Sequence, residues 1–470
     1  MRREPMRALL PAKVHQNRKW INLYDGVVFL AALLIVALRI EVAGCLVFLS
    51  LIGVTLVLSD RLSDIFLPLV LMTVFVTRCY DSFDVFIKYI PLYAAVLLCL
   101  VFHLIYYWAK PTFGPTFPGL VAVTAALTLG GIGSLSAAAY FRPMNLYYVL
   151  CLGILMPVLY IVAKPRANEE ARDRCLRGLF LMGCLAVFAV LTFYVRGWAQ
   201  ITRPFHVLTF QSKNNIATFL MISMPIGFFY SKQRRVLIVV PVIQYLAILF
   251  CNSRGGLLLG TAEFLLLLVF FCFYRSDWFR RAFFIGLFVL TVVMIFVLLP
   301  KAVTFNQFER KIKNYADLSH LQLFRALLVE MFNDEGRGGL FGRSITDFKS
   351  NPLFGTGLGN TANSDLYAGV KGTMVWYHMW LPQIWGSLGI VGLLAFGYQL
   401  YLRIRLSFSR RDFPDVTLSF CYLGLLLMSQ VNPGEFCPFP YAVIATVIFI
   451  LLEPPAQVRN GAASDENKTE

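Results

Sequence analysis

Long apolar runs alternate with short polar connections along almost the whole chain. From about residue 22 to residue 300, and again from 375 to 453, these runs approach the ~20 residues that an α-helix needs to cross a bilayer. Lipid offers no partner for backbone polar groups, so only helices or closed barrels can span it, and the runs lack the alternation of barrel strands. The pattern predicts an all-α, polytopic bundle with about 12–14 transmembrane helices.

The predicted spans form two groups, 22–300 and 375–453, separated by one long polar connection at 301–374. Residues 1–21 are expected to form a cytoplasmic N-terminal arm, and residues 454–470 a cytoplasmic, disordered tail. We place the individual spans at roughly 22–40, 42–58, 63–78, 86–108, 117–139, 145–163, 176–195, 214–230, 236–252, 255–274, 281–300, 375–402, 414–431 and 438–453.

The connection at 301–374 is long enough to suggest a function, because loops beyond about a dozen residues are uncommon in compact proteins. Asp317 to Phe332 has apolar residues at helical spacing, with Asp317 as the expected cap. A second helix is expected from about Gly338 to Lys349, ending before Asn351-Pro352 because the residue before proline disfavours the α region. Glycines 355, 357 and 359 then allow a tight turn.

Basic residues concentrate in every second connection between the predicted spans, as the positive-inside rule requires of cytoplasmic connections. This places both termini in the cytoplasm and residues 301–374 on the outer face of the cytoplasmic membrane. The residues concerned are Lys164, Arg166, Arg172, Arg174, Arg177, Lys232, Arg234, Arg235, Arg275, Arg280, Arg281, Arg403, Arg405, Arg410 and Arg411.

Composition narrows the function. The net charge of +16 could indicate nucleic-acid binding, but the cations lie between apolar runs and do not interleave with exposed aromatics, so no nucleic-acid partner is expected. The ten cysteines lie mostly inside spans without metal-ligand spacing, which favours buried apolar packing over disulfides or a metal site. No Walker A sequence occurs, and the glycines at 355–359 follow no strand, so no nucleotide cofactor is expected.

Four polar elements carry candidate chemistry at the predicted outer face. Because no ATP is present there, bond formation would have to use a preactivated substrate. The elements are Gln211-Ser-Lys213-Asn214-Asn215; Asn252-Ser253-Arg254-Gly255-Gly256; Gly336-Arg337, before Pro352-Leu-Phe-Gly355-Thr-Gly357; and Trp376-Tyr377-His378-Met379-Trp380, followed by Gln383 and Gly386-Ser-Leu-Gly389.

In order and spacing, these elements resemble the O-antigen ligase and O-antigen polymerase superfamily of bacterial envelope enzymes. The resemblance covers roughly residues 205–400 and rests on the asparagine-rich entry to a span, the Ser-Arg-Gly turn, the Gly-Arg before Pro-Leu-Phe-Gly-x-Gly, and the histidine before Gln. Two positions depart from the family pattern. Met379 replaces the Asn that usually follows the histidine, and Ser387 replaces an acidic residue.

The resemblance implies an enzyme that transfers a glycan from an undecaprenyl-diphosphate carrier to an acceptor hydroxyl without a metal. The acceptor, as a ligase or polymerase would use it, is a glycan, a lipid or a protein. Arginine binds phosphate oxygens bidentately and would stabilise the departing diphosphate, and a histidine is a suitable general base for an alcohol. We assign catalysis to His378, Arg254 and Arg337, and substrate binding to Lys213, Asn215, Arg203 and Ser253.

Each assignment has a simpler structural alternative. Arg254 could snorkel to the interface, Arg337 could be a solvated loop residue, and His378 could belong to an interfacial aromatic belt. Lys213 and Arg203 could be ordinary flanking charges. Rival bases or acids are His206, His320, Asp334, Glu335 and Asp365, whereas Arg325 and Arg343 suit a helix surface and His103 suits a packed, hydrogen-bonded site inside a span.

The alternative function is a polysaccharide or lipid-linked glycan transporter or flippase, which would also have many spans. Transporters of this kind show internal repeats and ionisable residues near the midplane. The sequence shows no repeat, and Glu263 and His103 are its only clear mid-span ionisable residues. The enzyme is therefore the favoured interpretation.

Overall fold

The computed structural model describes residues 18–76, 90–133, 148–196, 213–251, 253–274, 278–305, 312, 314–332, 335–357, 377, 379–432 and 434–454. Within these ranges the chain is almost entirely helical, and none of the described residues forms a strand. The all-α, polytopic fold class predicted from the apolar runs is confirmed.

The helices of the first half are α2 (Arg18–Leu38), α3 (Glu41–Leu58), α4 (Ser63–Val76), α6 (Ile90–Tyr106), α7 (Phe117–Gly133), α10 (Met156–Ala163) and α11 (Glu169–Arg196). A π-helical segment, Val149–Leu155, leads into α10, and a 3₁₀ turn, Lys164–Arg166, leaves it. The second half contains α12 (Lys213–Ser231), α13 (Val239–Phe250), α14 (Arg254–Phe273), α15 (Trp278–Phe305), α16 (His320–Phe332), α17 (Glu335–Ser350), α18 (Trp380–Ser409), α19 (Phe413–Met428) and α20 (Val443–Leu452).

Seven helical segments of the described chain are long and apolar enough to cross a membrane, and six further apolar helices are shorter. Within the described residues, each expected span coincides with a helix or a pair of consecutive helical segments. How many of these helices cross the bilayer stays a prediction, as do the domain boundaries.

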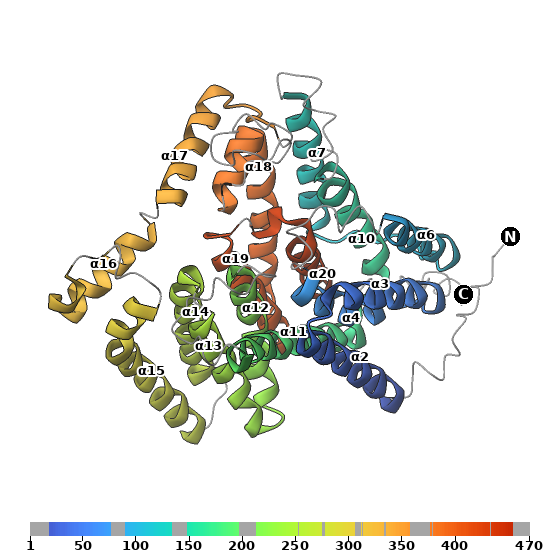
Figure 1. The fold of residues 1–470 in the computed structure, drawn as a ribbon. Coiled ribbons are helices and arrows are strands. Elements are labelled where there is room, and N and C mark those ends of the chain that lie inside the picture. The colour runs from blue at the N-terminus through green and yellow to red at the C-terminus, as the bar shows by residue number, and fades with distance from the viewer. Residues whose placement is uncertain are drawn as a thin grey trace, which may run out of the picture.

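Helix α12 lies at the centre of the bundle. Every residue from Ile216 to Phe228 is buried, so this helix has no face left for lipid. It packs along α19 on one side and along α11 and α13 on others, with α14 close by (Figure 1). Helices α15, α16 and α17 follow one another along one flank, and α2, α3 and α6 lie on the opposite flank. The first residue of α12, Lys213, thereby begins a helix fixed from several sides.

Helix α18 is broken at Gly389, whose φ of 62° and ψ of −152° are not helical. The loop after α17 fills this break with backbone hydrogen bonds. Thr356 N donates to Gly386 O (2.9 Å), Gly357 N to Ser387 O (2.9 Å), and Ile390 N to Pro352 O (2.8 Å). The Pro-Leu-Phe-Gly-Thr-Gly motif therefore satisfies carbonyl and amide groups that the broken helix would leave unpaired.

Two glycines make this insertion possible. Gly355 and Gly389 both have positive φ, and each meets backbone of the other segment where a side chain would begin. A Cβ on Gly389 would lie 2.6 Å from Leu353 C and from Pro352 O. Gly355 and Gly389 thus mark the close approach of two backbones, whereas Gly386 makes room for the Tyr377 ring.

The two helices expected in the long connection are present as α16 and α17. Helix α17 ends at Ser350, just before Asn351-Pro352, as expected. The predicted cap of the first helix is wrong. Asp317 ends a short 3₁₀ turn, and α16 begins at His320 after Ser319, which exchanges hydrogen bonds with Gln322 in a capping box.

Replacing Gly389 with alanine should destabilise the protein, because the residue would have to keep a conformation that is almost exclusive to glycine. The expected cost is about 1–3 kcal/mol. Gly397→Ala in the same helix is the matched control, since a Cβ there meets nothing within 4 Å, and alanine favours the helix by up to about 1 kcal/mol. Thermal unfolding of both variants in one detergent checks this, and equal melting temperatures would contradict it.

Candidate functional site

The first turns of α12 and α14 meet at one end of the bundle, which we call the site end. Ser253 is the N-cap of α14: its Oγ accepts a hydrogen bond from Gly256 N (3.0 Å) and donates to Asn214 Oδ1 (2.7 Å). Gly256 also approaches Ala217 so closely that a Cβ would lie 2.6 Å from the alanine Cβ. Lys213 and Arg254, the first residues of the two helices, therefore lie on neighbouring helix N-termini.

The turn after α19, Ser429–Asn432, forms a third side of the site end. The Nδ2 atom of Asn432 donates to Asn215 Oδ1 (3.1 Å), which also accepts a hydrogen bond from the hydroxyl of Tyr441 (2.8 Å). The backbone of Gly255 packs on Val431, whose Cγ2 would lie 2.5 Å from a Cβ at that glycine. This turn thus contacts both helix N-termini.

The start of α18 joins the same turn. Trp380 N donates to Ser429 O (2.9 Å). Just before it, Tyr377 N donates to Gln383 Oε1 (3.0 Å) and the Tyr377 hydroxyl donates to Asp347 Oδ2 on α17 (2.5 Å). Burial raises the pKa of Tyr377, and the hydrogen bond to Asp347 raises it further, so the side chain remains a phenol that donates to the carboxylate.

The predicted catalytic residues are described to different extents. Arg254 begins α14 at the site end, and Arg337 lies in the first turn of α17, although its side chain is outside the described part. His378 lies outside the described residues, between Tyr377 and Met379, which are both placed. The chain is held on both sides of His378. Before it, Tyr377 is hydrogen-bonded to Asp347 of α17, and after it, Trp380 is hydrogen-bonded to Ser429.

The predicted substrate-binding residues divide in a similar way. Lys213, Asn215 and Ser253 lie together at the site end, joined through Asn214. Asn215 and Ser253 use their side chains for hydrogen bonds within the protein, so both hold the helix starts in place. Arg203 lies outside the described residues.

The rival assignments gain little from the structure. His320 is exposed at the start of α16, and Arg325 is exposed on the same helix. Arg343 forms an ion pair with Asp347 one turn along α17 (3.2 Å). His103 is buried, and its Nδ1 lies 2.9 Å from Leu56 O, so the packed, hydrogen-bonded histidine is confirmed. His206, Asp334 and Asp365 lie outside the described residues, as does the side chain of Glu335.

The sequence analysis missed the segment after α19 altogether. Glu435 follows the end of that helix, yet its Oε1 accepts a hydrogen bond from Tyr422 (2.6 Å), six residues before the helix end at Met428. The chain therefore folds back into the bundle after Asn432. The other Glu435 oxygen pairs with Arg403 of α18, and both charged side chains are almost completely buried.

The prediction that Arg403 lies in a basic connection between two spans is wrong. This arginine lies inside α18, with its guanidinium carbon 4.9 Å from the centroid of the Phe449 ring. A buried charge is tolerated when it is paired, and here the pair fixes the re-entrant segment to α18. Asn432 and Glu435 could have drawn attention as polar residues between two apolar runs.

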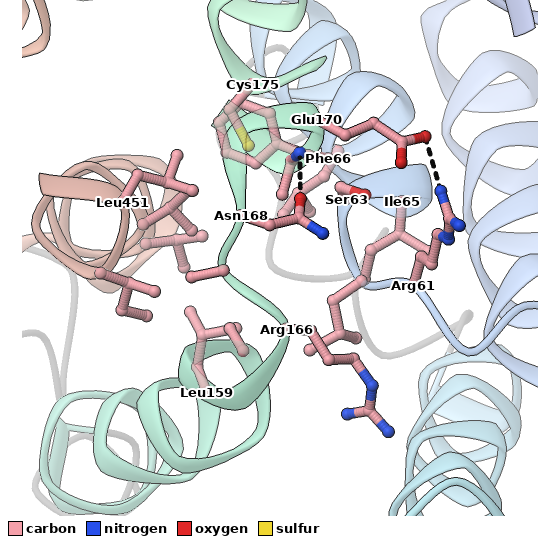
Figure 2. A pocket seen from close by; sticks show the side chains of 18 of the residues that line it. Arg61, Ser63, Ile65, Phe66, Leu159, Arg166, Asn168, Glu170, Cys175 and Leu451 are labelled. Carbon is pink, nitrogen blue, oxygen red and sulfur yellow. Dashed lines mark hydrogen bonds and ion pairs between the residues drawn. The ribbon is translucent and has the colours of Figure 1, made fainter. Parts of the chain in front are cut away.

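A cavity of about 230 Å³ lies at the other end of the bundle (Figure 2). Apolar side chains of α4, α10 and α20 line it, with Arg61, Arg166, Asn168 and Glu170 at its polar side. Helix α11 runs between the two ends: Glu170 lies beside the cavity, whereas Tyr194 donates to Phe250 O near the start of α14. Those residues are ~36 Å apart along an ideal helix. The cavity contains none of the predicted site residues.

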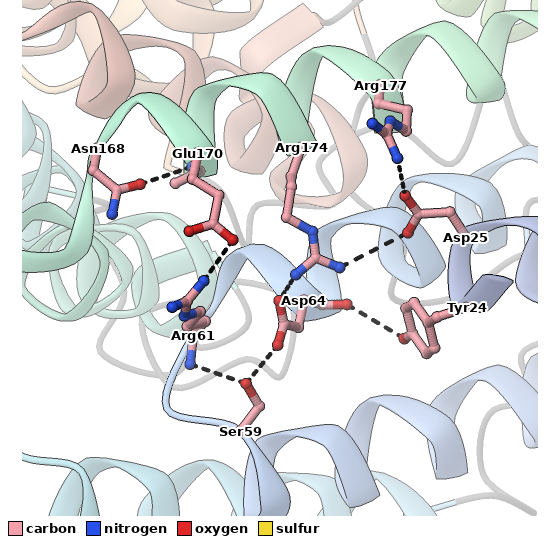
Figure 3. A network of polar contacts seen from close by, with 10 residues as sticks. Tyr24, Asp25, Ser59, Arg61, Asp64, Asn168, Glu170, Arg174 and Arg177 are labelled. Atoms are coloured by element: carbon pink, nitrogen blue, oxygen red, sulfur yellow. Dashed lines mark hydrogen bonds and ion pairs between the residues drawn. The ribbon is translucent and has the colours of Figure 1, made fainter. Parts of the chain in front are cut away.

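Beside this cavity, acidic residues of the N-terminal helices pair with the start of α11 (Figure 3). Arg174 pairs with Asp64 of α4 and, at 3.8 Å, with Asp25 of α2, while Arg177 also pairs with Asp25 (2.9 Å). Several cations counted for topology are thus engaged in ion pairs that join helices. Among the described residues, no group of three or more metal-ligating side chains occurs at either end.

Residues 239–397 match the family model for O-antigen ligase. The match confirms the resemblance drawn from the motifs and covers about a third of the chain, from the start of α13 into α18. It includes Ser253, Arg254, Arg337 and His378 but not Lys213 or Asn215. Neither a curated protein nor a solved structure matches the chain.

Breaking the buried ion pair between Arg403 and Glu435 should strongly destabilise the protein. Glu435→Gln leaves the Arg403 charge buried without its counterion, at an expected cost of about 3–5 kcal/mol. Glu170→Gln is the matched control, because its side chain and that of its partner Arg61 are 44% and 32% exposed, and such pairs contribute about 0–1 kcal/mol. The melting temperatures of both variants, measured in the same detergent, test this expectation. A larger decrease in melting temperature for Glu170→Gln than for Glu435→Gln would contradict it.

Proposed function

We propose that this membrane protein transfers a glycan from an undecaprenyl-diphosphate carrier to an acceptor hydroxyl at the outer face of the cytoplasmic membrane. The family match supports ligase- or polymerase-like glycosyl transfer in general. The single observation that carries the donor assignment is the pairing of two helix N-termini, each beginning with a cation, at the site end.

This arrangement suits a diphosphate for electrostatic reasons. The first turn of a helix presents unpaired N–H groups and a partial positive charge, which favour a bound anion. Helices α12 and α14 have 19 and 20 residues, and both bring this end to the same place. Lys213 and Arg254 add full charges, and an arginine can grip two phosphate oxygens at once.

In the proposed reaction the acceptor oxygen attacks the anomeric carbon, the bond from that carbon to the diphosphate oxygen breaks, and the carrier leaves as a diphosphate anion. His378 takes the acceptor proton as general base. Arg254 and Arg337 stabilise the negative charge that gathers on the leaving group, which lowers the barrier because that charge is greater in the transition state. Inner-membrane location with cytoplasmic termini is part of the proposal and rests on the basic connections.

Substitutions should separate donor binding from chemistry. Arg254→Ala and Arg337→Ala should weaken binding of a polyprenyl diphosphate roughly 10- to 150-fold, the equivalent of about 1.5–3 kcal/mol for a charged hydrogen bond. His378→Ala should leave that affinity unchanged and reduce turnover about 10²- to 10⁴-fold. Binding of a labelled polyprenyl diphosphate to purified protein, with a turnover assay beside it, measures both effects.

Arg325→Ala is the matched control, because this arginine is exposed on α16, which packs on α15, and neither quantity should change. In cells, His378→Ala should let flipped lipid-linked donor accumulate on the outer face. Loss of flipping itself would support the transporter alternative, and normal turnover by His378→Ala would remove the histidine as base.

The proposed transfer should proceed in the presence of a chelator. The mechanism assigns the charge on the leaving diphosphate to arginines, so divalent cations have no required role. Turnover by purified protein should stay the same after EDTA treatment, with a known metal-dependent glycosyltransferase as the positive control for chelation. Loss of activity that a divalent ion restores would contradict the mechanism.

A further inference from the structure

The turn Ser429–Asn432 contacts three elements of the site at once. It accepts a hydrogen bond from Trp380 N at the start of α18, it packs through Val431 on Gly255 of α14, and it donates from Asn432 to Asn215 of α12. This turn lies outside the stretch that matches the O-antigen ligase family. No motif recognised in the sequence includes it.

Asn215 receives two hydrogen bonds on one oxygen atom. Asn432 Nδ2 and the Tyr441 hydroxyl both donate to Oδ1. In the sequence, these two residues precede and follow Glu435. Asn215 lies two residues after Lys213, within the first turn of α12, so fixing the asparagine fixes that turn. The amide does this without adding negative charge beside the cations.

The turn is itself held firmly. Ser429 Oγ donates to Leu425 O (2.7 Å), and Glu435 is tied to Tyr422 and to Arg403. Two cations that start neighbouring helices repel each other, so a rigid neutral support lowers the cost of keeping them together before an anion binds. The turn has the contacts that this support requires.

We propose that Asn432 is a positioning residue of the donor site. It holds the start of α12, and with it Lys213, against the start of α14, so that both helix N-termini and their cations face one diphosphate. The inference rests on the proposed function for its ligand, and it adds a segment that donor binding requires.

The main test is the affinity for a polyprenyl diphosphate. Asn432→Ala should raise the Kd about 3- to 10-fold, the range for one neutral hydrogen bond, while turnover at saturating donor and its pH profile stay unchanged. Gln430→Ala is the matched control: this amide is two residues away and exposed, and within the described part of the chain it donates to Leu426 O, one turn earlier. Its Kd should equal that of the unmodified protein.

A double substitution tests whether Asn432 acts through Lys213. Lys213→Ala should weaken donor binding alone, and adding Asn432→Ala should weaken it little further, because the two effects share one route. Multiplicative effects of the two substitutions would overturn the positioning role. If Asn432→Ala fails to fold, Asn432→Leu takes its place, since it has a similar size and removes the donor without adding a charge.

A charge test uses Asn215→Asp. The new carboxylate still accepts from Asn432 and Tyr441, so the support remains, but it adds a negative charge beside Lys213 and Arg254. Donor affinity should fall more than for Asn432→Ala, and part of the loss should be relieved at high salt because these half-buried charges are partly screened. An unchanged affinity at low salt would overturn the placement of the diphosphate next to Asn215.

The failure of this inference can be told apart from the failure of the proposed function. If Arg254→Ala weakens donor binding but Asn432→Ala behaves as Gln430→Ala, the turn has no part in the donor site. If Arg254→Ala and Lys213→Ala both leave the affinity for polyprenyl diphosphate unchanged, the donor assignment itself is wrong, and the inference falls with it.

Discussion

The architecture around the site depends on one constraint: backbone N–H and C=O groups must find partners inside the protein where water is absent. Helix α18 breaks this rule at Gly389 unless another segment supplies the missing partners. Residues 352–357 supply them, through hydrogen bonds on both sides of the break. The long connection is thereby joined to the bundle, and α17, which carries Arg337, is fixed to α18.

The rest of the site end is assembled by neutral side chains. Asn214 links to the cap of α14, Asn215 links to the turn after α19, and Tyr377 links α17 to the chain beside His378. Amide and hydroxyl groups can hold cationic helix starts together without neutralising them. Carboxylates are used elsewhere: Asp347 of α17 accepts from the Tyr377 hydroxyl, and Glu435 pairs with the buried Arg403.

Much of this could be predicted from the sequence. Apolar runs located the helices because the bilayer imposes their length, and Gly355 and Gly357 located the turn after α17 because glycine readily adopts the positive φ found there. The break at Gly389 was not predicted, since the apolar run continues through it. What the glycines were for could not be predicted, since it depends on two backbones 30 residues apart coming together, as Thr356 and Gly386 do. The cap at Ser319 was missed because Asp317 offered an equally acceptable residue two positions earlier.

The candidate site was predictable in part for a similar reason. Arg254 and Ser253 follow from a local signal, a capping residue and a cation before an apolar run. Asn432 and Glu435 carry no such signal, because their roles come from contacts with Asn215 and Arg403, more than 30 residues away in each case. Arg403 was misread because a cation near a helix end looks the same whether it faces water or a buried acid.

The boundaries of the family match have a consequence for protein engineering and for divergence among relatives. The matched stretch, 239–397, begins after α12 and ends inside α18, so it omits Asn214, Asn215 and Asn432, which hold its arginine-bearing helix in register. A chimera that exchanged only this stretch would receive Arg254 without the residues that hold the start of α14. Recombination that preserves these contacts must therefore transfer α12 and the chain after α19 together with it.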